Sequence, residues 1–462
     1  MTAATLPRSR PSDQGVDAAG IIGFLDAVEA SKIDLHSLMV LRHGHVVAEG
    51  WWAPYRPDLV HLLYSLSKSF TSTAIGLAEA EGLLSIDDPV VKFFPDKVPE
   101  DASPYVTGMK VRHLLSMASG HATDTVGQLR AGGTDWVRAF LSVPPDKEPG
   151  TLFCYNQGCT YTLSAIITEL TGQRLVDYLR PRLFDPLGID RAVWQQSDEG
   201  IDLGFSGFHA ETESIAKLGL LHLQNGRWGD RQLLPESFAE EAHRKQVDNA
   251  ESSDNLDWQQ GYGFQFWRCT HDGFRGDGAF GQFCVMLPAA DAVVACTAQV
   301  SDMQGELNLI WKHLLPALSG QGGSADADAA LADRLGRLST ATIAGGAAGP
   351  DTEVTFPRVG EPSATTAAVT GIRVAPSGTG SRLTVVTESG ERAFDLRPGA
   401  WTDGELPGLR ALIPSVAVTG GWTAPDRFEA DMVFVTTPHR LQLRAMAGDQ
   451  PGVEVGWQVE PL

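Results

Sequence analysis

The sequence lacks any run of 18 apolar residues, so no segment is expected to cross a bilayer as a helix. Residues 1–15 are polar and lack the apolar stretch of a secretion signal. Basic residues are also in deficit, because 36 Lys and Arg stand against 57 Asp and Glu, a net charge of −21. An acidic chain repels phosphate backbones. We therefore expect a cytoplasmic protein with neither a membrane nor a nucleic acid as partner.

Cysteine is scarce and carries no pairing pattern. The five cysteines are odd in number and form no Cys-x-x-Cys motif, which favours free thiols in a reducing compartment. His43 and His45 form an isolated His-x-His with no evident third ligand, so no metal is expected. Hydrophobic residues make up 43% of the chain, enough to bury a large core without metals or disulfides. No cofactor is expected.

Hydrophobic periodicity predicts helices near both ends of the first 320 residues and strands beside them. Helical spacing is found at 18–30, 65–82, 163–170 and 307–318, and β-type patterns are found at 38–41, 46–48, 262–267, 282–287 and 292–297. The strands bracket a helical middle. They can therefore share one antiparallel sheet, with the terminal helices on one face and the helical insertion beside it.

The composition changes after residue 320. Residues 339–349 are rich in Ala, Gly and Thr without periodicity, as in a linker, and alternating apolar residues then recur between turn signals. We therefore predict a domain over 1–320, a linker over 321–349 and a small β-barrel or β-sandwich over 350–462.

A Ser-x-x-Lys motif at Ser65 and Lys68 offers a chemical function. On a helix, residues i and i+3 lie on one face with their Cβ atoms about 5–6 Å apart. A lysine whose pKa is lowered by burial could take the serine proton, which is the chemistry of an acyl-enzyme. The same motif recurs at Ser214 and Lys217, where an amphipathic pattern favours a helix cap for the serine.

Two further segments strengthen this interpretation. Tyr155 lies in a turn before the 163–170 helix, and a Gly-rich segment, Gly276-Asp277-Gly278, runs into the 282–287 strand. Small residues at a strand edge allow close approach of the backbone to a substrate carbonyl. Cys154 would point away from Tyr155 in an extended segment, which favours a structural role for its thiol.

With these motifs, the sequence over residues 18–318 resembles the serine β-lactamase and penicillin-binding protein superfamily. It is most similar to class C-like members: family VIII carboxylesterases, nylon-oligomer hydrolases and D-amino-acid peptidases. Segments 111–121 and 183–189 carry further resemblance. The resemblance implies an α/β (α+β) β-lactamase-like fold, with an antiparallel sheet, flanking helices and a helical subdomain. The C-terminal β segment resembles lipocalin-like domains appended to some members.

Carried over by position, the resemblance implies Ser65 as nucleophile, Lys68 as its partner and Tyr155 as the phenol or phenolate that relays protons to the leaving group. The backbone N–H groups of Ser65 and Ala279 would form the oxyanion hole. Further substrate contacts are expected from Gln157, Gly276, Asp277 and Gly278.

Two departures from the family pattern bear on the substrate. The second motif, usually Tyr-x-Asn, has Gln157 in its third position, and the third motif has no cation at Gly276, where Lys or His is usual. Arg275 is one step along the strand and is expected to point to the other face. Without that cation, and with Asp277 present, carboxylate-bearing substrates such as β-lactams are disfavoured. We expect neutral or amine-bearing esters or amides instead.

The resemblance leaves three functions open. The leading one is an acyl-enzyme hydrolase of a small-molecule ester or amide, more esterase or amidase than β-lactamase. The others are an acyltransferase or transpeptidase with an amine acceptor, and a non-catalytic acyl-binding sensor. The sequence does not define the oligomeric state.

Overall fold

The computed structural model describes residues 5–320, 322–378, 380–409 and 412–462. The described residues divide into two compact units. The first contains residues 5–50 and 62–336, and the second contains 51–61 and 337–462. Among the described residues, no helix combines the length and apolar character needed to cross a bilayer.

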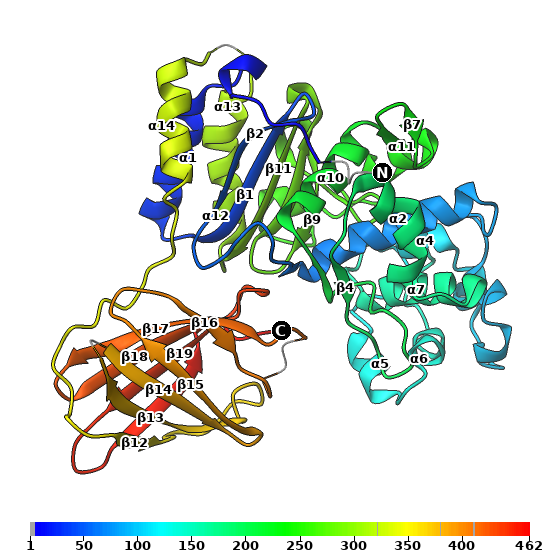
Figure 1. Ribbon diagram of the computed structural model, residues 1–462. Helices are drawn as coiled ribbons and strands as arrows, with labels where there is room; N and C mark the ends of the chain where they lie inside the picture. The colour runs from blue at the N-terminus through cyan, green and yellow to red at the C-terminus, as the bar shows by residue number, and fades with distance from the viewer. Residues whose placement is uncertain (1–4, 321, 379, 410–411) are drawn as a thin grey trace. The chain divides into compact units, whose positions relative to one another are not determined.

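The first unit is built on an antiparallel sheet with the strand order β2-β1-β11-β10-β9-β8 (Figure 1). Helix α1 packs against β1 and is itself contacted by α12, α13 and α14, and α10 packs against β1, β10 and β11 on the opposite face of the sheet (Figure 1). The bounds are β1 (Asp34–Arg42), β2 (His45–Trp51), β8 (Trp267–Arg268), β9 (Phe274–Gly278), β10 (Gln282–Leu287), β11 (Ala292–Gln299), α1 (Ala18–Ser31), α10 (Thr212–Leu223), α12 (Met303–Leu309), α13 (Leu315–Ala317) and α14 (Ala325–Leu335). This arrangement confirms the antiparallel sheet flanked by helices.

Between β2 and β8 the chain is mainly helical, as its periodicity predicts. Its core is α2 packed against α7, which follows from the buried faces of both helices. The helices are α2 (Ser67–Ala80), α3 (Pro104–Gly108), α4 (Val111–Leu115), α5 (Val126–Ala131), α6 (Trp136–Ser142), α7 (Gln157–Thr171), α8 (Leu175–Leu179), α9 (Asp185–Leu187) and α11 (Glu236–His243). The short strands are β3 (His61–Leu62), β4 (Ala192–Trp194), β5 (Phe208–Ala210), β6 (Arg227–Trp228) and β7 (Arg231–Gln232).

The strand expected over 262–267 is wrong. Only Trp267–Arg268 forms β8, because Gln265 adopts a left-handed conformation with φ 63°. The Gln265 side chain donates from Nε2 to the main-chain oxygens of Leu114 and Leu115, at 3.1 and 2.8 Å. The alternating aromatic residues there are nevertheless buried, at 1% exposure for Tyr262, Phe264 and Phe266. The intervening Gln265 is also buried, at 2% exposure, so the alternation of aromatic and other residues here does not mark a strand with one buried face.

The second unit is all β, as its alternating pattern predicts. Each strand pairs antiparallel with the next in two sheets, β12-β13-β14-β15 and β16-β17-β18-β19-β20. Both sheets contribute side chains to one apolar core. The strands are β12 (Val354–Pro357), β13 (Val369–Ser377), β14 (Gly380–Thr387), β15 (Gly390–Leu396), β16 (Thr402–Glu405), β17 (Ser415–Ala424), β18 (Arg427–Val433), β19 (Arg440–Met446) and β20 (Gly452–Trp457). The lipocalin-like relationship stays a prediction.

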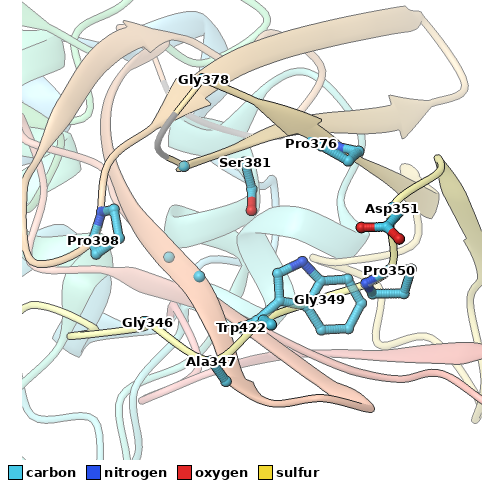
Figure 2. Close-up of a pocket in the computed structure, with 14 residues that line it drawn as sticks. Gly346, Ala347, Gly349, Pro350, Asp351, Pro376, Gly378, Ser381, Pro398 and Trp422 are labelled. Carbon is cyan, nitrogen blue, oxygen red and sulfur yellow. The ribbon is translucent and has the colours of Figure 1, made fainter.

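A small cavity of about 280 Å³ lies within this second unit (Figure 2). Its walls are mostly glycine and proline, so they consist largely of main chain and pyrrolidine rings. Trp422 borders the cavity while its ring also packs edge-on against Phe428 in the apolar core, with centroids 5.5 Å apart. The cavity therefore adjoins the core, whose apolar side chains pack against one another.

The packing of segment 51–61 within the second unit can be tested by replacing Tyr55. Tyr55 is 5% exposed and packs with Ala417, Val433 and Val435. We expect Tyr55→Ala to lower the free energy of unfolding of this unit by about 2–4 kcal/mol, since a buried aromatic ring is lost. Calorimetry of the full chain would measure it. Tyr105→Ala, at a ring that is 41% exposed, should change stability by less than about 0.5 kcal/mol. Equal small shifts in both variants would contradict the packing.

Candidate active site

Ser65 lies in a 3-10 turn, Tyr64–Leu66, that leads directly into α2. The turn is fixed by Ser67, whose Oγ donates to the Tyr64 oxygen at 2.6 Å and accepts from the Phe208 N–H at 3.1 Å. The Leu63 N–H adds a bond to the Phe208 oxygen at 2.8 Å. The nucleophile candidate is therefore held on a turn that is anchored to β5 on one side and continues as α2 on the other.

Lys68 lies one turn later and reaches back to Ser65. Its Nζ donates to Ser65 Oγ at 3.0 Å and to the main-chain oxygen of Phe205 at 2.9 Å. The side chain is 1% exposed, and burial lowers the pKa of Lys68 to about 7 although Asp124 and Asp277 act in the opposite direction. A neutral amine is therefore accessible near pH 7, within hydrogen-bond distance of the serine hydroxyl.

Tyr155 is placed against this pair by the start of α7. Asn156 caps that helix, with its Oδ1 accepting from the Gly158 N–H at 2.9 Å. Lys68 Nζ lies 4.6 Å from the centroid of the Tyr155 ring, and the ring stacks on Trp267 at 5.3 Å. Burial, helped by Asp277, raises the pKa of Tyr155, although a hydrogen bond with Ser65 opposes the shift. Of the phenol and phenolate forms, these surroundings favour the phenol.

Strand β9 approaches the nucleophile turn closely through two glycines. A Cβ on Gly278 would lie 2.0 Å from the Leu63 main-chain oxygen, and one on Gly276 would lie 2.5 Å from both Leu66 Cδ1 and Ser69 Oγ. A side chain at Gly278 would collide with main chain, and one at Gly276 would require the Leu66 and Ser69 side chains to shift. A lysine or histidine at Gly276 would require the same side chains to move.

Arg275 does not supply the missing cation to a substrate. Its side chain is fully buried and pairs with Asp277, with Nη2 and Oδ2 3.0 Å apart. Its Nη1 donates to the main-chain oxygen of Asp257 at 2.7 Å, and its guanidinium lies 4.2 Å from the Trp258 ring centroid. Arg275 and Asp277 thus share the face opposite to Gly276, as the strand period predicts. Burial raises the pKa of Asp277, while Arg275 opposes this.

Gln157 is the first residue of α7. Its N–H donates to Asp124 Oδ1 at 2.9 Å, and its buried Oε1 has no hydrogen-bond partner among the described residues. Asp124 itself was not singled out from the sequence, because it lies in a loop outside the motifs. The Phe205 oxygen was also missed, since a main-chain acceptor has no side-chain signature.

The other sequence candidates fall outside this cluster. Ser214 lies inside α10, whose N-cap is Glu211, so the cap expected at Ser214 is wrong. Lys217 donates to the Gly188 oxygen at 2.9 Å and pairs with Glu213. Cys154 is a free cysteine, and burial raises the pKa of its thiol to about 11, which disfavours a thiolate.

A serine, a buried lysine and a tyrosine gathered beside an antiparallel sheet define a class of serine-based active site. The family model described as Beta-lactamase matches residues 26–315, more than half of the chain, and the chain belongs to that family. The resemblance found in the sequence is thereby confirmed, and the sheet with its helices is a β-lactamase-like fold.

The individual relatives share only low sequence identity with this chain. The 6-aminohexanoate-dimer hydrolase of Paenarthrobacter ureafaciens is 25% identical, over 56% of this chain and 71% of its own length. Esterase EstB of Burkholderia gladioli is 28% identical over 41% of this chain, which spans only 55% of the EstB length. The octameric penicillin-binding protein homologue of Pyrococcus abyssi has a TM-score of 0.52 and 16% identity, covering 96% of this chain and 98% of its own. That last likeness shows the fold alone.

The two glycines give a paired test of the close approach. We expect Gly278→Ala to cost about 1–3 kcal/mol of stability, because the added methyl meets main chain that cannot rotate away. Gly276→Ala should cost less, since it meets side-chain atoms that can shift by small amounts. Urea unfolding of both variants measures the difference. A larger loss for Gly276→Ala would contradict the geometry.

Proposed function

We propose that this chain is a serine hydrolase that cleaves an ester or amide bond of a small molecule through an acyl-enzyme on Ser65. The observation that carries the proposal is the 3.0 Å contact between Lys68 Nζ and Ser65 Oγ, made by an amine whose pKa is lowered to about 7. Lys68 has the lowered pKa and Tyr155 the raised one. The amine is therefore the general base and the phenol the proton donor.

The reaction proceeds in two halves. Neutral Lys68 accepts the Ser65 proton as Oγ attacks the carbonyl carbon, and the N–H groups of Ser65 and Ala279 stabilise the oxyanion. As the tetrahedral intermediate collapses, Tyr155 donates its proton to the leaving alcohol or amine and regains one from the Lys68 ammonium. Water then attacks the acyl carbon. Lys68 and Tyr155 again transfer the protons and the two N–H groups again stabilise the oxyanion, so that the acid and free Ser65 are released.

The charges around the site support neutral or amine-bearing substrates. Gly276 carries no cation, Arg275 is committed to Asp277, and Asp124 lies close enough to raise the pKa of Lys68. A substrate carboxylate would therefore meet negative potential without a partner. The names of the two relatives described above, a 6-aminohexanoate-dimer hydrolase and an esterase, fit an amide or an ester as the bond cleaved. They do not bear on the charge preference, because a 6-aminohexanoate dimer carries a carboxylate as well as an amine. Substrate contacts at Gln157 and Asp277 remain part of the proposal.

The roles of Ser65 and Lys68 are tested by replacement. Ser65→Ala should lower kcat/KM on p-nitrophenyl acetate by at least about 1000-fold, because the nucleophile is lost. Lys68→Arg should lower it at least about 100-fold, since a guanidinium stays charged and cannot accept the proton. Ser214→Ala and Lys217→Arg, in the second Ser-x-x-Lys motif, are the matched controls. A Ser65→Ala variant that keeps turnover would refute the mechanism.

The pH dependence follows from the lowered pKa of Lys68. Below pH 7 the amine is protonated and cannot act as base, so log kcat/KM should rise with unit slope and level off above about 7. Stopped-flow assays on a phosphate-free buffer series would measure this. A midpoint near the ordinary lysine pKa of about 10.4 would show that burial does not control the amine.

Substrate charge is tested with three p-nitrophenyl esters of equal chain length that end in methyl, ammonium or carboxylate. We expect the carboxylate ester to have a kcat/KM about 10-fold below the methyl ester, because like charges repel in a partly desolvated site. Added amine acceptors, with product analysis, separate hydrolysis from acyl transfer. A lasting Ser65 adduct in intact mass spectra would instead indicate an acyl-binding sensor. A carboxylate ester that is the fastest substrate would overturn the charge argument.

A further inference from the structure

Two aromatic residues with unusual backbone conformations flank the proposed oxyanion donors. Tyr64, directly before Ser65, has φ 47°, and Phe280, directly after Ala279, has φ 69°. Positive φ is strained for residues with large side chains and is ordinarily left to glycine. Such strain persists only where the surrounding structure enforces it. Tyr64 contributes the carbonyl of the peptide unit whose N–H belongs to Ser65, so its conformation directly orients that N–H. Phe280 follows Ala279, so its conformation acts on the Ala279 N–H through the Ala279 residue.

The rings of these two residues contact each other. Their centroids are 5.2 Å apart and their planes meet at 69°, which is the favourable edge-to-face arrangement of an aromatic pair. Tyr64 is 8% exposed and Phe280 is 9% exposed, so the contact is largely shielded from water. Backbone strain that glycine would relieve thus accompanies a specific contact that glycine could not make.

The two turns are otherwise anchored to different parts of the unit. The Tyr64 turn is tied to β5 and α2 by Ser67, as described above. The Phe280 turn is tied to β11, because the Phe280 oxygen accepts from the Val300 N–H at 3.1 Å. Gln282 extends this second anchor, with Nε2 donating to the Ala279 oxygen at 3.0 Å and the Ala298 oxygen at 2.8 Å. The ring contact therefore joins two turns that have separate hydrogen-bond anchors, and it adds to the close approach of β9 to the Tyr64 turn at Gly278.

We propose that the Tyr64–Phe280 ring pair positions the oxyanion hole by fixing the separation and direction of the Ser65 and Ala279 N–H groups. The proposal rests on the proposed function, because it assumes that those groups bind the oxyanion. Both are positioning residues and neither reacts. An oxyanion hole works through donors that are preorganised around the tetrahedral state, so a small displacement weakens that state more than the bound substrate.

The decisive variants are Phe280→Leu and Phe280→Gly. The first keeps apolar volume without the ring, and the second also relieves the strained φ. Both should lower kcat on p-nitrophenyl acetate by about 10- to 100-fold with KM changed less than about twofold, because the donors lose their fixed spacing. The affinity for a boronic acid that forms a tetrahedral Ser65 adduct should fall by the same factor as kcat/KM. Tyr64→Phe keeps the ring and should stay within about twofold of wild type.

Two controls separate positioning from packing and from substrate contact. Phe24→Leu removes a fully buried ring on α1 and should leave kcat unchanged even where it lowers the thermal midpoint. The pH midpoint of all variants should match wild type, since Lys68 is untouched. For each ester, the KM of the Phe280 variants is compared with the KM of wild type. If that ratio changes with acyl chain length, Phe280 binds substrate, and this overturns the proposal.

The outcomes distinguish a failure of the positioning role from a failure of the proposed function. If wild type turns over through Ser65 but both Phe280 variants keep full kcat and boronic acid affinity, the ring pair has no positioning role and the proposed function stands. If wild type shows neither turnover nor a Ser65 adduct, the proposed function fails and the positioning role falls with it. If Phe280→Gly is unfolded by circular dichroism, Phe280→Leu and Tyr64→Leu give the same test.

Discussion

The burial of the Lys68 amine is the constraint on which the rest of the site depends. A protonated amine loses hydration when it is buried, and here that loss outweighs the attraction of Asp124 and Asp277, so the pKa is lowered to about 7. A neutral amine has two N–H groups and one lone pair. In the structure Nζ donates to both the Phe205 oxygen and Ser65 Oγ. A neutral amine could keep the first bond while its lone pair accepts the Ser65 proton across the same short contact.

The buried pair Arg275–Asp277 supports the same condition. Asp277 raises the pKa of Lys68, and Arg275, fully buried at 3.0 Å from that carboxylate, offsets part of the negative field. A buried ion pair adds little to stability on its own account. Its consequence here is electrostatic: it keeps an acidic residue beside the site without anchoring a proton on the amine. The pair also explains why Arg275 cannot substitute for a cation at Gly276.

The features of the site that depend on the identity and spacing of side chains could be predicted from the sequence. The spacing of Ser65 and Lys68, the position of Tyr155 before a helix, and the opposite faces of Gly276 and Arg275 all follow from helix and strand periods. The Phe205 oxygen, the left-handed Tyr64 and Phe280, and the irregular chain at Gln265 could not, because they depend on main-chain geometry set by distant packing. The same applies to segment 51–61, which clusters with residues more than 270 positions later.

Burial acts on the base and on the acid in a complementary way. It disfavours the charged form of both, so it lowers the pKa of Lys68 to about 7 and raises the pKa of Tyr155, and a neutral amine is accessible near pH 7 beside a neutral phenol. In the proposed reaction, the attack by Ser65 creates an ammonium on Lys68 and an oxyanion on the substrate. A site of this kind gains from donors aimed at the oxyanion, because they stabilise that charge together with the Lys68 ammonium. The precision of the Ser65 and Ala279 N–H groups should accordingly matter more to the rate than to substrate binding.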